Sequence, residues 1–66
     1  MRFKLNKHQI KMLIDGKELK NGKEKITATD NIRQSLKKIN PDEVNVYIVS
    51  EGTFYKKYSI TIEPIN

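Results

Sequence analysis

The segment VNVYIVSEGTFYKKYSITI, residues 44–62, decides the fold of this chain, because apolar and polar residues alternate in it twice. In the first stretch, Val44, Val46 and Ile48 share one face. Alternation with a period of two indicates strands with one buried face, so the segment predicts an antiparallel hairpin. The apolar face of its second strand is formed by Phe54, Tyr58, Ile60 and Ile62.

The apolar pattern also predicts the loop of this hairpin. A loop of residues 51–52 would place Val46 opposite Lys57, and so set the apolar face of one strand beside the polar face of the other. A loop of residues 51–53 places Val46 opposite Tyr58 and brings the two apolar faces together. Since a slip of one residue turns every side chain to the other face, the longer loop is expected. On the outer face, this register pairs Val49 with Tyr55 and Tyr47 with Lys57.

Two further strand regions precede this hairpin. MRFKL, residues 1–5, alternates apolar with basic residues and predicts a short strand. Asn21-Gly22 is a strong hairpin signal, because both central residues of a type I′ turn need positive φ. Residues 17–28 are therefore expected to form a second hairpin.

Residues 7–15 are predicted to form the first helix. Asn6 is a good N-cap, and Gln9 three residues later completes a capping-box pattern. Apolar residues recur at helical spacing up to Ile14, and Gly16 supplies a C-terminal signal.

Residues 30–39 are predicted to form the second helix. Thr29 or Asp30 caps its start, and Pro41 excludes its continuation. The resulting order is β-α-β-β-α-β-β over a single domain, residues 1–66. We expect an α+β fold, a two-layer sandwich with two short helices on one face of a mostly antiparallel sheet.

Composition argues against most enzyme and metalloprotein classes. The chain has 66 residues, no cysteine and one histidine, His8. The residue one helical turn after His8 is Met12, so no carboxylate stands there to orient the imidazole. Neither a nucleophile elbow nor a phosphate-binding glycine loop is present. We therefore expect no catalytic residues, no metal and no cofactor. Without a long apolar run or a signal-peptide pattern, a cytoplasmic protein without a membrane partner is expected.

Charge is distributed unevenly along the chain. Residues 1–38 hold eleven Lys or Arg and four acidic residues, whereas residues 39–66 hold two Lys and four acidic residues. A positive balance favours anionic partners, although amphipathic helices need a polar face in any case. If both helices pack on one side of the sheet, their outer sides would form one basic surface. The candidate residues for contacts with phosphates or nucleic acid are Lys7, Lys11, Arg33, Lys37 and Lys38.

The open face of the sheet is a second candidate surface, for base stacking or for a protein partner. Aromatic rings beside basic residues can stack unpaired bases, and tyrosine is also enriched in protein interfaces. The residues assigned to it are Tyr47, Tyr55, Lys56 and Lys57.

Two functions follow from these surfaces. The first is a non-enzymatic basic module that binds nucleic acid or another phosphate-bearing ligand through lysine-rich helix faces. The alternative is a small inhibitor or accessory protein, of the kind that phages encode, which occupies the surface of a host protein. A homodimer formed through the open sheet face or a sheet edge is a third candidate.

Overall fold

The computed structural model describes residues 2–52 and 57–65. Its element order is the expected β-α-β-β-α-β-β. The expected positions of Phe54, Tyr55 and Lys56 lie outside the described residues. The elements are β1 (Arg2–Leu5), α1 (Lys7–Ile14), β2 (Leu19–Asn21), β3 (Glu24–Ile26), α2 (Asp30–Lys37), β4 (Val44–Glu51) and β5 (Lys57–Pro64).

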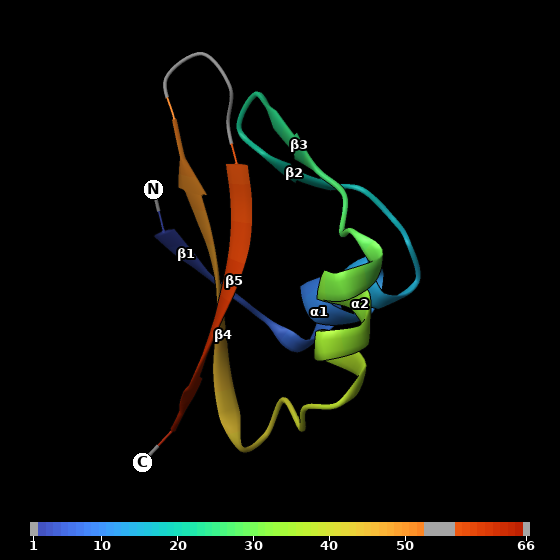
Figure 1. Cartoon of the computed structure of the whole chain (residues 1–66), viewed down its shortest axis with the longest axis vertical. Helices are drawn as coiled ribbons and strands as arrows, with labels where there is room; N and C mark the ends of the chain where they lie inside the picture. The colour runs from blue at the N-terminus through green and yellow to red at the C-terminus, as the bar shows by residue number, and fades with distance from the viewer. Residues whose placement is uncertain (1, 53–56, 66) are drawn as a thin grey trace.

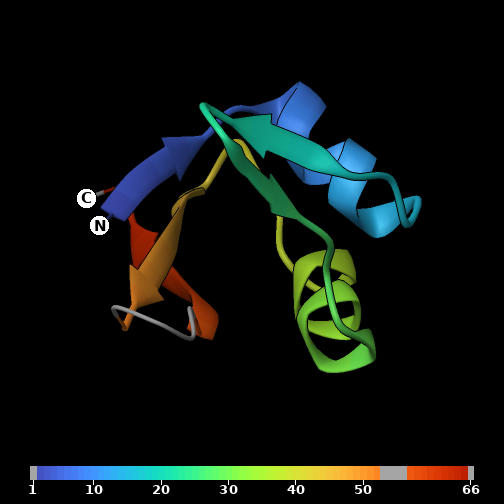
Figure 2. The same ribbon diagram turned by 90° about the horizontal axis from the view of Figure 1, so that it is seen from above.

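The strands form two antiparallel sheets. β4 is the central strand of a three-stranded sheet with the order β1-β4-β5, and β2 pairs with β3 in a separate two-stranded sheet. Figures 1 and 2 show both helices and the β2–β3 hairpin on the same side of the three-stranded sheet. No described element covers the opposite side in these views. The expected α+β fold, with its helices on one face of the larger sheet, is confirmed.

The predicted register of the β4–β5 hairpin was wrong by four residues. Val46 lies opposite Ile62 instead of Tyr58, and Glu51, which was expected in the loop, lies opposite Lys57 within the ladder. The shift is even, so every described side chain of β4 and β5 keeps its predicted face. The observed register places Ile62 within the ladder. The expected register would have set it opposite Asp42, before β4 begins.

The β2–β3 hairpin turns at a different pair of residues than predicted. Asn21 lies opposite Glu24, so Gly22 and Lys23 occupy the central turn positions. Gly22 has φ of 64°, and no described residue other than glycine has positive φ. A type I′ turn needs positive φ at both central residues, so that prediction was wrong. Positive φ at the first central residue alone is the pattern of a type II′ turn, which favours glycine there.

The ends of α1 follow the sequence signals. The backbone N–H of Gln9 donates to Oδ1 of Asn6 over 2.8 Å, and the backbone N–H of Asn6 donates to Oε1 of Gln9 over 2.9 Å. Gly16, with φ of 78°, follows the last turn. The N–H of Gly16 donates to the carbonyl of Leu13, and that of Lys17 donates to the carbonyl of Met12. These two bonds form a Schellman motif, which satisfies carbonyls at the end of the helix.

The helix α2 begins after its expected cap but ends early. The hydroxyl of Thr29 accepts from the backbone N–H of Ile32 over 3.3 Å. The helix ends at Lys37, whereas residues up to Ile39 were expected in it. Each helix has eight residues, and none in the described part of the chain is long and apolar enough to cross a membrane.

The core lies between the three-stranded sheet and the layer of helices and hairpin. Its four most enclosed large side chains come from both layers: Leu13 and Leu36 from the helices, and Val46 and Ile48 from β4. Leu19 and Ile26 extend the core beneath the hairpin. The helix–hairpin layer is therefore attached by its apolar side, which leaves its charged side chains outside.

Candidate functional site

The two basic residues of α1 expected to contact phosphate are both exposed. Lys7 is the first residue of the helix and forms an ion pair with Asp42 in the loop before β4. Both side chains of this pair keep about two thirds of their surface in water, 68% and 65%. Lys11 lies in the last turn, where a positive charge is favoured by the helix dipole. Of these two lysines, only Lys7 has its charge partly neutralised by an ion pair among the described residues.

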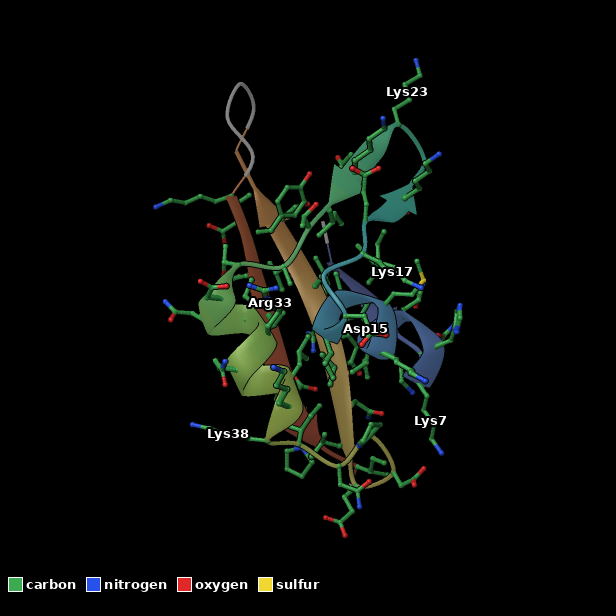
Figure 3. The ribbon with its side chains drawn as sticks, turned by 90° about the vertical axis from the view of Figure 1, so that its right-hand side faces the viewer. Lys7, Asp15, Lys17, Lys23, Arg33 and Lys38 are labelled. Atoms are coloured by element: carbon green, nitrogen blue, oxygen red, sulfur yellow. The ribbon has the colours of Figure 1, made fainter. Side chains whose placement is uncertain are left out.

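Arg33 of α2 has a structural role that the sequence did not indicate. Its guanidinium forms an ion pair with Asp30, one turn earlier on the same helix. It also reaches the turn after α1, because a β-carbon placed on Gly16 would lie 3.5 Å from its Nη1. Figure 3 shows Arg33 at the side of α2 that faces α1. Arg33 therefore lies close to the turn after α1, and its ion pair makes it less available to a ligand than an unpaired lysine.

Lys37 and Lys38 end α2 and are exposed. Figure 3 shows Lys38 and Lys7 pointing away from the molecule in different directions, with the two helices between them. The five predicted residues therefore lie on one layer but do not converge on one point. Such a distribution suits an extended partner better than a small ligand.

The β2–β3 hairpin contributes basic residues that the sequence interpretation missed. Lys20 and Lys25 are directly opposite each other and exposed, on the face of the hairpin away from Leu19 and Ile26. Lys23 occupies the turn and extends from the end of the molecule in Figure 3. The signal that could have found them is the alternation in KELKNGKEKI, residues 17–26, which places Lys20 and Lys25 opposite the apolar face.

The outer face of the three-stranded sheet differs from its predicted arrangement. Tyr47 lies opposite Thr61, and Lys57 lies opposite Glu51, so the expected Tyr47–Lys57 pair does not form. The guanidinium of Arg2 lies over the ring of Tyr47, with Cζ 4.0 Å from the ring centroid. One face of the Tyr47 ring is therefore occupied by a side chain of the same molecule, which limits base stacking there.

Two hollows lie beside α1. The larger, of about 430 Å³, contains Lys4 and Lys7 together with side-chain amides near the start of the helix. The smaller, of about 200 Å³, is lined by His8, Lys11, Met12, Asp15 and Lys17. Within residues 2–52 and 57–65, no three His, Asp or Glu side chains are grouped so that they could hold a metal ion. The full lining of the larger hollow is Lys4, Leu5, Asn6, Lys7, Gln9, Ile10, Pro41, Val44 and Asn45.

Comparisons with protein-family models, with curated proteins and with solved structures gave no significant match.

Proposed function

We propose that this protein is a non-enzymatic basic module that binds nucleic acid through its layer of helices and hairpin. The supporting observation is where the net charge lies. Residues 7–38, which build this layer, hold nine Lys or Arg and four acidic residues, a balance of +5 that equals the net charge of the chain. Because the layer lies on one side of the sheet (Figure 1), this charge is carried by elements on that side of the molecule.

The hairpin carries the strongest argument for an anionic partner. Lys20 and Lys25 are opposite each other, and like charges at directly opposed positions destabilise a strand pair. Lys23 adds a third positive charge at the turn. A phosphate backbone lying along this hairpin would offset the repulsion, and release of its counterions would favour binding. The hairpin lysines are therefore expected to make the main phosphate contacts of the proposed interface.

The helices extend this interface. Lys11, Lys37 and Lys38 are exposed, and each could reach a phosphate without breaking an ion pair found in the described residues. Lys7 and Arg33 are already paired with carboxylates, so their contribution to binding would be smaller. Contacts of this kind are made to phosphates and carry little sequence information. Binding is thus expected to depend weakly on base sequence and strongly on salt.

The test is fluorescence polarisation of labelled duplex and single-stranded oligonucleotides at several salt concentrations. Two matched variants, Lys25→Glu on the hairpin and Lys4→Glu on the outer sheet face, change the net charge equally. For duplex DNA, Lys25→Glu should make the negative slope of log K against log salt shallower by about 0.9, the value for one lost phosphate contact. Lys4→Glu should leave the slope unchanged. In addition, Lys25→Glu replaces a like-charge pair by an opposite-charge pair, so thermal stability should not fall while binding weakens.

Three results would overturn the proposal: no binding at low salt, binding that ignores salt, or equal effects of the two variants. The alternative function, occupation of a host protein's surface, is then tested directly. If the chain binds no oligonucleotide but retains a specific protein from nuclease-treated lysate, its partner is a protein and not nucleic acid.

A further inference from the structure

β5 is an edge strand with an open side. Among the described residues, β5 pairs only with β4, and Figure 2 shows β1 and β5 as the two margins of the larger sheet. β5 has eight residues, whereas the other margin, β1, has four. A long edge strand presents unpaired backbone N–H and C=O groups that can pair with another chain. Pro64 ends this surface, because proline has no N–H to donate.

The residues of this edge are complementary to themselves. In the segment KYSITIE, residues 57–63, an antiparallel pairing of two copies centred on Ile60 sets unlike charges opposite each other at both ends. The aromatic and aliphatic side chains also meet, and so do the two hydroxyl-bearing residues. The pairs are Lys57 with Glu63, Tyr58 with Ile62, Ser59 with Thr61, and Ile60 with its own copy.

Neighbouring registers lose the charge pairing. Centring the two strands on Ser59 would set Lys57 opposite Thr61, and centring them on Thr61 would set Ser59 opposite Glu63. Both of these registers keep each side chain on the same face of the sheet as the register centred on Ile60 does. Only the charge pairing therefore distinguishes the three registers. The register centred on Ile60 uses residues 57–63 in full and stops before Pro64.

The geometry of the strand suits this pairing. Glu63 is held on the outer face by Arg2, whose Nη2 donates to its Oε1 over 2.6 Å. Oε2 is the second acceptor of this carboxylate, available to a lysine of another chain. Lys57 is exposed on the same face of the sheet. On the inner face, Ile62 keeps 36% of its surface in water and would pack against the ring of Tyr58 from a second copy.

From this complementarity we infer that the protein forms a two-fold dimer in which the β5 strands of two copies pair antiparallel about Ile60. The two sheets become one sheet with the order β1-β4-β5-β5-β4-β1. The two-fold axis is perpendicular to that sheet, so both layers of helices and hairpin lie on the same side. The dimer goes beyond the proposed function, but it would place two basic layers side by side for one polyanion.

The test is sedimentation velocity of the full chain over a concentration series, with charge reversals at the two ends of the edge. Lys57→Glu alone and Glu63→Lys alone each create two like-charge contacts per dimer, and each should weaken dimerisation about tenfold or more. The double variant, Lys57→Glu with Glu63→Lys, restores opposite charges between the two copies and should therefore dimerise more tightly than either single variant. Lys4→Glu, a charge reversal of the same face on β1 at the far margin of the sheet, is the matched control and should dimerise normally.

Circular dichroism of each variant shows whether the monomer is folded, and the double variant separates charge complementarity from damage to the fold. A wild-type chain that is monomeric at every concentration overturns the inference. A dimer that survives both single reversals also overturns it, and points to the outer sheet face as the contact. Failure of the double variant to dimerise, while it remains folded, rejects the proposed register. Oligonucleotide binding by a monomer would leave the proposed function standing.

Discussion

The guanidinium of Arg2 lies 4.0 Å from the centroid of the Tyr47 ring, measured from its Cζ, and the same side chain forms an ion pair with Glu63. Arg2 belongs to β1, Tyr47 to β4 and Glu63 to β5, so one side chain spans all three strands of the sheet. A cation over an aromatic ring is attracted by the ring's electron-rich face. Arg2 therefore stabilises the position of the short strand β1 through contacts with β4 and β5 on the outer face of the sheet.

Replacement of Arg2 by alanine should lower the free energy of unfolding by about 1 kcal/mol, since an exposed cation–π contact and an exposed ion pair each contribute up to about 1 kcal/mol. Urea denaturation measures this change. Lys4→Ala, on the same strand and face, is the control and should alter stability by less than about 0.5 kcal/mol. Equal losses of unfolding free energy in the two variants would show that the contacts of Arg2 add nothing to the effect of removing one positive charge from this face.

Removal of the Tyr58 hydroxyl should loosen the β2–β3 hairpin from the larger sheet. That hydroxyl donates to Oε2 of Glu24 over 3.2 Å, across a sequence separation of 34 residues. Tyr58→Phe keeps the ring and removes this bond, so the expected loss is about 1 kcal/mol, as for a typical hydrogen bond. Amide hydrogen exchange should be faster in β2 and β3 and little changed in β1. Unchanged exchange in the hairpin would mean that its apolar contacts alone hold it in place.

Substitutions of two adjacent residues at the turn of the β2–β3 hairpin should differ in their effect on thermal stability. Gly22 has φ of 64°, a region in which an L-residue costs about 1–2 kcal/mol, although a β-carbon there would meet no atom within 4 Å. Gly22→Ala should therefore lower the melting temperature by roughly 4–8 °C for each kcal/mol lost. Asn21→Ala should have the smaller effect, because Asn21 has negative φ. A larger loss from Asn21→Ala would instead support the type I′ turn expected from the sequence.

Local signals in the sequence were reliable where the interaction is itself local. The capping box of Asn6 and Gln9 and the positive φ of Gly16 were found where the sequence placed them, and of the two candidate caps of α2 the structure uses Thr29. Each depends on residues three or four positions apart, so neighbouring residues suffice to specify it. The helix α2 was predicted too long because Ile39 packs against the core from outside the helix.

The candidate site was predicted only in part. The helix lysines are exposed, as the amphipathic pattern requires, but the pattern did not show that Arg33 and Lys7 are paired with Asp30 and Asp42. It also did not show that Lys20 and Lys25 stand opposite each other, because the turn was placed one residue too early. Ion pairs and cross-strand neighbours depend on which segments meet, and that depends on tertiary structure.

By itself, the sequence determined the order of the elements and the buried face of each strand in residues 44–62, because alternation with a period of two fixes the side to which a residue points. It could not choose among registers that differ by an even number of residues, since all of them keep that alternation. The tertiary structure made this choice. It set Ile60 and Ile62 opposite Ile48 and Val46, the fully buried pair of β4, and brought the Tyr58 hydroxyl to Glu24. Apolar pairing across the strands, beside the buried residues of β4, thus accompanies the register that also defines the open edge of β5.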